Sequence, residues 1–274
     1  MNSNLVNTDW LIEHLEDDNL IILDATLPKA TDKNKNLNTE CIPGAQKFDI
    51  KNVFSKLDQP FPNTVPSKEQ FEKNAQLLGV NTDSTIVVYD QHGVYSSPRA
   101  WWLFKLFGHK NVFVLDGGLK SWKAEKQPIA IEHTNSTKSG NFKSNPNIAL
   151  VKYKNEILEN LNNPDTQIID ARSNKRFLGT EPEPREGLRA GHIPGSKNLH
   201  YALLTENNEL ISDEIIQGLF NLLEIKNSKT IYSCGSGITA CILALAGTQI
   251  GIDEFSIYDG SWTEWGSLND LPIE

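Results

Sequence analysis

The residues of this sequence best suited to chemistry are a cysteine and the glycine-spaced loop that follows it. Residues 230–233 are β-rich and predict a short strand that ends at Cys234. Residues 235–239 read Gly-Ser-Gly-Ile-Thr, and an apolar helix is expected to begin near Thr239. Open α/β sheets bind ligands at the carboxyl ends of their strands. The thiol is therefore a candidate nucleophile.

The loop after Cys234 is also suited to holding an anion. Gly235 and Gly237 allow the chain to curl, so that the main-chain N–H groups from Gly235 to Thr239 point inward as a nest, and the following helix adds its positive N-terminal end. Making the thiolate dominant at neutral pH requires a pKa about two units lower, or roughly 2.7 kcal/mol. The alternative reading is a small buried cysteine in a turn, which is also what we expect of Cys241 in the helix.

The two halves of the sequence repeat the same signals at a separation of about 145 residues. The matched pairs are the apolar runs 20–25 and 167–172, the Ile-Pro-Gly turns 42–44 and 193–195, the runs 85–89 and 230–234, and Asp-Gly-Gly 116–118 with Asp-Gly-Ser 259–261. In both halves a tryptophan follows the last of these landmarks. Four matched landmarks in one order indicate an internal duplication.

The arrangement of elements predicts an α/β fold of two similar domains. Within each half, β-rich runs alternate with helical stretches such as residues 68–78 and 99–107. That alternation favours a mostly parallel sheet flanked by helices. Residues 131–141 are polar with little apolar periodicity and are expected to form the linker. We place the boundary near residue 140, giving domains 1–140 and 141–274.

Composition excludes several classes of function. The net charge of -9 disfavours nucleic acid and anionic membranes as partners, and no apolar run approaches the roughly 18 residues that a membrane span needs. Three cysteines argue for reduced thiols, and the start of the chain shows no targeting pattern, so a cytoplasmic location is expected. The six histidines have no metal-binding spacing, so no metal or other cofactor is expected.

Several of these motifs resemble the 3-mercaptopyruvate sulfurtransferases of the rhodanese superfamily. Residues 234–240 resemble the active loop of that family, residues 258–265 its C-terminal signature, and residues 97–102 and 115–119 its first-domain motifs. The resemblance covers essentially the whole chain. It implies two tandem rhodanese domains, of which the first is catalytically silent and the second carries Cys234. In agreement, residues 89–93, which align with the Cys234 region, contain no thiol.

The same resemblance implies which residues bind the substrate. Arg176 and Arg185 match the arginines that grip the carboxylate and keto oxygen of a 2-oxo acid donor, and a guanidinium fork suits a carboxylate. They lie in a Pro-rich segment, 175–187, that we do not expect to be helical. The alternative is that they pair with Glu181, Glu183 or Glu186. Tyr95 resembles a first-domain residue that reaches the substrate across the cleft, although simple packing is also open.

The implied reaction passes through a persulfide. The Cys234 thiolate attacks the sulfur of 3-mercaptopyruvate, and the two arginines stabilise the departing enolate of pyruvate. The loop amides, including those of Ile238 and Thr239, cradle the outer sulfur until a small thiol, a thioredoxin-like dithiol or cyanide removes it. Ser236 has a possible relay role, with loop capping as the alternative.

Two further residues concern that relay. In some relatives it includes a histidine before the first Ile-Pro-Gly turn, but this sequence has Cys41 there, which puts the relay in doubt. Cys41 could instead trap sulfur or form a regulatory disulfide with Cys234. His192, at the corresponding position of the second half, is expected to be a structural turn residue.

Three other functions compete with this interpretation. A thiosulfate-preferring sulfurtransferase would need basic residues in the loop, and residues 235–237 supply none. A cysteine phosphatase would need an arginine six residues after the nucleophile, where this chain has Ala240. A non-catalytic rhodanese-type binding module is disfavoured by the intact thiol, glycine loop and arginines.

Overall fold

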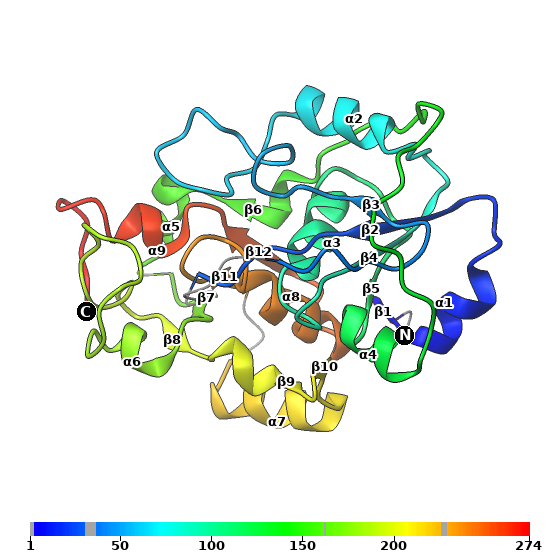
Figure 1. The fold of residues 1–274 in the computed structure, drawn as a ribbon. Helices are drawn as coiled ribbons and strands as arrows, with labels where there is room; N and C mark the ends of the chain where they lie inside the picture. The colour runs from blue at the N-terminus through cyan, green and yellow to red at the C-terminus, as the bar shows by residue number, and fades with distance from the viewer. Residues whose placement is uncertain (1–2, 31–36, 162, 226–228) are drawn as a thin grey trace. The chain divides into compact units, whose positions relative to one another are not determined.

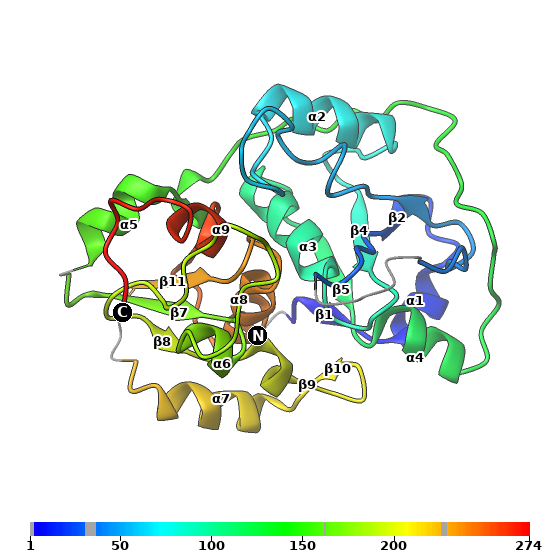
Figure 2. The ribbon, with the colours of Figure 1, turned by 60° about the vertical axis from the view of Figure 1, so that its left-hand side comes forward.

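The same parallel sheet is built twice along the chain (Figures 1 and 2). The computed structural model describes residues 3–30, 37–161, 163–225 and 229–274. The two five-stranded sheets have the orders β1-β5-β4-β2-β3 and β6-β12-β11-β7-β8. These orders correspond strand for strand, and the neighbouring strands in both sheets run parallel. The predicted fold class of two similar α/β domains is confirmed.

The strands of the two sheets are short, and helices connect them. The first sheet contains β1 (Leu5–Val6), β2 (Leu20–Asp24), β3 (Gln46–Lys47), β4 (Thr85–Tyr89) and β5 (Val112–Leu115). Its helices are α1 (Thr8–His14), α2 (Lys68–Leu77), α3 (Ser97–Leu106) and α4 (Gly118–Ala124). The second contains β6 (Val151–Lys152), β7 (Thr166–Asp170), β8 (Lys197–Asn198), β11 (Lys229–Ser233) and β12 (Phe255–Tyr258). Its helices are α5 (Lys154–Asn160), α6 (Asn174–Phe177), α7 (Asp213–Leu222), α8 (Ala240–Gln249) and α9 (Ser261–Trp265). The remaining elements are the 3-10 turns η1 (Ile148–Leu150) and η2 (Tyr201–Leu204) and the two-stranded sheet of β9 (Thr205–Glu206) and β10 (Glu209–Leu210).

The chain divides into two compact units. Unit 1 comprises Met1–Leu57, Val65–Asn147 and Asn207–Leu210, and unit 2 comprises Asp58–Thr64, Ile148–Glu206 and Ile211–Glu274. The stretch predicted as a linker, residues 131–141, is hydrogen-bonded along unit 1. Thr134 N donates to Ala45 O, and Gly140 N donates to Gln76 O. Unit 1 therefore extends to Asn147, and this limit does not coincide with the predicted boundary near residue 140.

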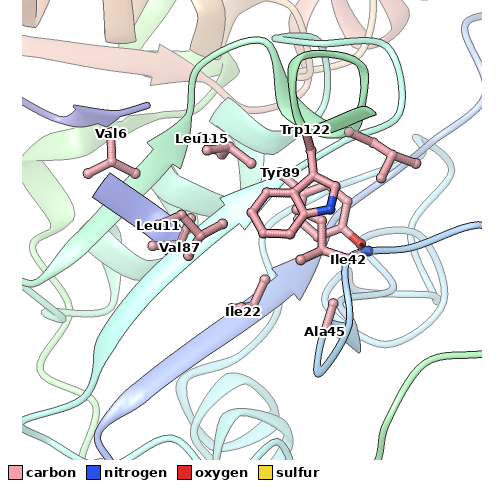
Figure 3. Close-up of a cluster of buried hydrophobic side chains, with 10 residues drawn as sticks. Val6, Leu11, Ile22, Ile42, Ala45, Val87, Tyr89, Leu115 and Trp122 are labelled. Carbon is pink, nitrogen blue, oxygen red and sulfur yellow. Dashed lines mark hydrogen bonds between the residues drawn. The ribbon is translucent and has the colours of Figure 1, made fainter. Parts of the chain in front are cut away.

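Unit 1 buries both faces of its sheet, which explains why the central strand β4 is apolar at consecutive positions. On one face, Leu11 of α1 and Trp122 of α4 pack over Ile22 and Val87 (Figure 3). Another group consists of aromatic rings from α2, α3 and the adjoining loops: Phe48, Phe54, Phe71, Phe104, Phe107 and Phe142. Within β4, each residue from Ile86 to Tyr89 is buried.

Unit 2 is packed in the same way around β11. A cluster from α5, α9 and three strands includes Ile157, Ile168, Ile231, Tyr258, Trp262 and Trp265. Helix α8, which directly follows the Cys234 loop, is buried at each position from Ala240 to Gly247. A helix that is apolar on all sides belongs in a core. The loop before α8 is thus fixed between a buried strand and a buried helix.

Unit 1 contains a carboxyl group whose titration should affect stability. Burial, together with the smaller effect of the Glu209 charge, raises the pKa of Asp116 to about 6. Because the pKa of Asp116 is higher in the folded state, the folded protein holds this proton more tightly than the unfolded chain does. The resulting contribution to the free energy of unfolding is complete below the ordinary pKa of 3.8 and is lost as the pH rises through 6. We expect Asp116→Asn to raise the free energy of unfolding by about 1–2 kcal/mol at pH 7.5. The amide oxygen can still accept from Leu210 N, as Asp116 Oδ1 does at 2.9 Å.

Urea unfolding at pH 4 and pH 7.5 tests this expectation. The gain should disappear at pH 4, and the exposed control Asp18→Asn should change little at either pH. An equal effect of Asp116→Asn at both pH values would contradict the assigned titration.

Candidate active site

Cys234 is the first residue after the central strand of unit 2, β11, which pairs with β7 and β12. Its main chain is fixed by the segment at the start of α9: Trp262 N donates to Cys234 O at 2.9 Å, and Cys234 N donates to Ser261 Oγ at 3.2 Å. The thiol is free, and the residue is 1% exposed. The sulfur therefore lies under the surface of its loop, at the carboxyl edge of the sheet.

The loop after Cys234 presents main-chain donors that its own unit does not use. Gly237 has a φ of +74°, a left-handed conformation that favours glycine and turns the chain back on itself. Within the part of the chain that the structure describes, the N–H groups of Gly235, Ser236, Ile238 and Thr239 have no hydrogen-bond acceptor. Helix α8 begins immediately afterwards, at Ala240. Free amides next to a helix N-terminus are what an anion site requires.

In the corresponding loop of unit 1, the main-chain N–H groups are bonded to the carboxyl group of Asp90. Asp90 directly follows β4 as Cys234 follows β11, and in each loop a positive-φ glycine, Gly93 or Gly237, lies three positions on. The Asp90 carboxyl is fully buried and accepts bonds from the loop that follows it. Oδ2 accepts from the main-chain N–H groups of Tyr95 (2.8 Å), Ser96 (2.9 Å) and Ser97 (2.9 Å), and Oδ1 accepts from His92 N (2.8 Å). The unit 1 loop is thus already filled by an oxygen acceptor, at the place where unit 2 carries sulfur.

Replacing Asp90 with asparagine should be strongly destabilising. If the asparagine NH₂ group takes the place of Oδ2, it cannot accept the three bonds that Oδ2 receives. If the side chain is rotated by 180°, the NH₂ group faces His92 N instead, and that bond is lost. We expect the free energy of unfolding to fall by about 2–4 kcal/mol. Urea denaturation of Asp90→Asn beside Asp18→Asn measures the effect. A loss no larger than that of the exposed control would show that the loop does not depend on this carboxyl group.

Arg176 and Arg185 both lie against the Cys234 loop. A Cβ atom placed on Gly235 would lie 3.1 Å from Arg176 Nη2 and 3.9 Å from Arg185 Nη1. Arg185 Nη2 also donates to Ser236 Oγ at 3.3 Å. Both guanidinium groups therefore lie beside the loop, and the absence of a side chain at position 235 gives them room.

The prediction that this arginine segment is not helical is wrong for its first part. Arg176 lies in α6, a helix of four residues, whose start is capped because Ser173 Oγ accepts from Arg176 N at 3.4 Å. The two prolines that argued against a helix, Pro182 and Pro184, lie beyond its end. Proline restricts the residues close to it and does not prevent a turn several positions earlier.

The two arginines differ in their ionic partners. Arg176 binds Glu183 through Nη2–Oε2 (2.5 Å) and Nε–Oε1 (3.2 Å), so the alternative of glutamate pairing holds for this arginine. Glu183 also accepts from the buried Arg172, which in turn binds Asp170. In the described part of the chain no carboxylate lies within 4.0 Å of Arg185. Arg185 therefore offers an uncompensated positive charge to the loop.

Further residues that the sequence did not single out complete this surrounding. Asn63 belongs to unit 2 and donates through Nδ2 to Ser236 Oγ (3.2 Å) and Ser236 O (3.3 Å). Ser261 Oγ lies 3.9 Å from Cys234 Sγ. Burial first, and then the charge of Arg176, lower the pKa of His200. The buried ion pair of Asp170 and Arg172 has a local signal in the sequence, because the two residues are two positions apart. Asn63 and Ser261 have no such signal, because they come from distant parts of the chain.

The remaining predicted residues lie elsewhere. Tyr95 belongs to unit 1, is 8% exposed and contacts the His92 ring, so its role toward substrate stays a prediction. Cys41, also in unit 1, is buried with Sγ 3.4 Å from Glu132 O, and burial raises the pKa of its thiol. As expected, His192 packs structurally, stacked on Phe177 with ring centroids 3.8 Å apart, and Cys241 is buried in α8.

This architecture defines a class of protein: a duplicated α/β chain with a buried free cysteine in the loop after the central strand of one copy. Comparison with known proteins agrees. The family model for the rhodanese-like domain matches residues 7–125 and again 154–268. The 3-mercaptopyruvate sulfurtransferase of Escherichia coli is 37% identical over 276 residues, covering 98% of this chain and 97% of that protein. The thiosulfate sulfurtransferase of Bos taurus is 37% identical over 272 residues, covering 95% and 91%.

A solved structure gives the same result. The crystal structure of SseA from Escherichia coli, described as a 3-mercaptopyruvate sulfotransferase of rhodanese fold, aligns with a TM-score of 0.85 at 32% identity and covers 95% of this chain and 99% of that one. The chain belongs to the rhodanese family. Among the residues described, none of the helices combines the length and apolar character needed to cross a bilayer.

Proposed function

We propose that this chain is a sulfurtransferase that takes sulfur from 3-mercaptopyruvate onto Cys234 and passes it to a thiol or to cyanide. The observation that carries the proposal is the surrounding of Cys234: a loop with unused main-chain donors, flanked by Arg176 and Arg185. A persulfide anion needs donors without a bulky side chain in the way, and a small 2-oxo acid needs guanidinium groups for its oxygens. Both requirements meet at Gly235.

The charges around the loop favour 3-mercaptopyruvate over thiosulfate. Glu183 offsets the charge of Arg176, whereas Arg185 has no such partner in the described chain. One uncompensated positive charge matches the single carboxylate of 3-mercaptopyruvate, and a dianion would call for more. Residues 235–237 add no basic side chain. The relatives named for 3-mercaptopyruvate and for thiosulfate are about equally similar in sequence to this chain, so sequence identity does not decide between the two donors. The charge around the loop is the stronger argument for 3-mercaptopyruvate.

The reaction proceeds in two steps. The Cys234 thiolate attacks the donor sulfur, a new S–S bond forms and the C–S bond breaks, with its electron pair leaving on the enolate of pyruvate. Arg176 and Arg185 stabilise the enolate oxygen and carboxylate, and the enolate takes up a proton. In the second step an acceptor thiolate or cyanide attacks the outer sulfur, and Cys234 departs as a thiolate. No electron carrier or metal enters this balance.

The residues around the sulfur have distinct tasks in this scheme. The N–H groups of Gly235, Ser236, Ile238 and Thr239 would hold the outer sulfur as an anion. Ser236, whose hydroxyl oxygen accepts from both Asn63 and Arg185, is free to donate its proton toward the substrate. This arrangement supports a positioning or relay task for Ser236.

Measuring both donors with one enzyme preparation tests the choice. We expect kcat/KM for pyruvate release from 3-mercaptopyruvate to exceed kcat/KM for thiocyanate formation from thiosulfate and cyanide by at least about 10-fold. The reverse order would make the protein a thiosulfate sulfurtransferase. Absence of turnover with both donors would favour a non-catalytic binding module.

The acceptor and the location belong to the same proposal. Because the persulfide would be buried, its acceptor must present a sterically small nucleophile. A small thiol or a thioredoxin-like dithiol meets this requirement. The three cysteines are free thiols, which fits a reducing compartment such as the cytoplasm.

A further inference from the structure

Ser261 has a backbone conformation that is normally left to glycine. Its φ is +50°, in the left-handed region. The corresponding residue of unit 1, the third of the Asp-Gly-Gly sequence, is Gly118, with a φ of +54°. The next residue makes the same bond in both units: Leu119 N donates to Asp90 O at 3.1 Å, and Trp262 N donates to Cys234 O at 2.9 Å. The same turn thus carries glycine in one copy and serine in the other.

Unit 1 has no room for a side chain at this position. A Cβ atom on Gly118 would collide with Asp90 O and would lie 2.7 Å from Gly93 O. In unit 2 a side chain is accommodated, and Ser261 is fully buried. A non-glycine residue in this conformation costs conformational energy, which persists where the surroundings or the function require it. The side chain of Ser261 must therefore contribute something that glycine does not.

The contacts of the hydroxyl group indicate what that is. Ser261 Oγ accepts from Cys234 N at 3.2 Å, which fixes the nucleophile's main chain. The same oxygen is 2.8 Å from Tyr258 O and 3.9 Å from Cys234 Sγ. A hydroxyl has one hydrogen and rotates freely to suit its acceptors. It can donate to the carbonyl while the sulfur is neutral, and to the sulfur when the sulfur is an anion.

We propose that Ser261 stabilises the Cys234 thiolate, by holding its main-chain N–H and by turning its own hydrogen from Tyr258 O to the sulfur. The inference rests on the proposed role of Cys234 as nucleophile. Because Ser261 is sealed from solvent, water does not replace the donor once it is removed. A hydrogen bond donated to the sulfur favours its charged form, so loss of this hydroxyl should make the thiolate less stable relative to the thiol.

Two substitutions separate the hydroxyl from the backbone. Ser261→Ala removes the hydroxyl and keeps a Cβ in the left-handed conformation, and Ser261→Gly removes the hydroxyl and restores the residue that unit 1 uses. Alkylation of Cys234 by iodoacetamide, followed by mass mapping from pH 5 to pH 10, gives its apparent pKa in each protein. We expect an increase of about one unit in both variants, and kcat for 3-mercaptopyruvate at pH 7 lower by about 10-fold with KM little changed. Ser267→Ala, which removes an exposed serine hydroxyl from the segment after α9, should match the wild type.

Two results would overturn the proposal. One is an alkylation pKa unchanged in both variants. The other is a wild-type pKa in Ser261→Gly with a shifted value in Ser261→Ala alone, since backbone strain would then be the cause. Alkylation needs no sulfur donor, so these results decide the role of Ser261 even if 3-mercaptopyruvate proves not to be the substrate.

Discussion

Replacing Cys234 with serine should abolish sulfur transfer, with kcat/KM for 3-mercaptopyruvate falling by roughly 10⁴-fold or more. A serine hydroxyl is not ionised at neutral pH and forms no stable persulfide. The fold should be retained, because the main-chain bonds of Cys234 to Ser261 and Trp262 do not involve its sulfur. Pyruvate release, followed with a dithiol as acceptor, measures the loss, and circular dichroism confirms the fold.

Cys41→Ser is the matched control for this substitution. It makes the same chemical change at a buried thiol of unit 1 and should leave turnover unchanged. Activity that survives in Cys234→Ser and disappears in Cys41→Ser would move the nucleophile to the other unit. The same pair tests the hypothesis that Cys41 traps sulfur or forms a disulfide, because identical behaviour of wild type and Cys41→Ser under oxidant would remove it.

Arg185→Ala should produce the second largest effect, a decrease of about 10²–10³-fold in kcat/KM for 3-mercaptopyruvate. Arg185 has no carboxylate partner in the described chain, so its charge is available to the substrate, and its removal frees no buried anion. The main change should be in KM, because the carboxylate is bound equally in the ground state and the transition state. Arg185→Lys should recover only part of the loss, since an ammonium group lacks the guanidinium fork.

Lys175→Ala controls for the loss of a positive charge, because Lys175 is exposed and lies beside Arg176 on α6. Steady-state kinetics of the three variants should order them as Lys175→Ala near wild type, then Arg185→Lys, then Arg185→Ala. Equal values for Lys175→Ala and Arg185→Ala would mean that only general charge matters. Arg176→Ala is a poorer test, because it leaves the buried Glu183 with one arginine fewer and should also lower stability.

The sequence predicts the architecture well for a physical reason. Strands buried on both faces, such as β4 and β11, require continuous apolar runs, and the turns between elements require glycine and proline at fixed places. Both signals are local in the chain, so the duplication could be read directly. The helical turn containing Arg176 could not, because four residues are too few to show a helical period.

The surroundings of the candidate nucleophile depend on contacts between distant segments. Asn63 and Ser236 are separated by 173 positions, and no local pattern predicts such a contact. The exchange of Gly118 for Ser261 is visible in the sequence, but its meaning depends on the left-handed φ that only the structure provides. Likewise, the sequence shows only that residues 89–93 contain no thiol, whereas the structure shows the Asp90 carboxyl filling the loop.

The most direct test of this account is the mass of the protein after reaction with 3-mercaptopyruvate and removal of the excess donor. We expect a gain of one sulfur atom, located on the Cys234 peptide, lost on treatment with cyanide and absent in Cys234→Ser. An unchanged mass under conditions in which pyruvate is released, or a sulfur located on Cys41 or Cys241, would contradict it.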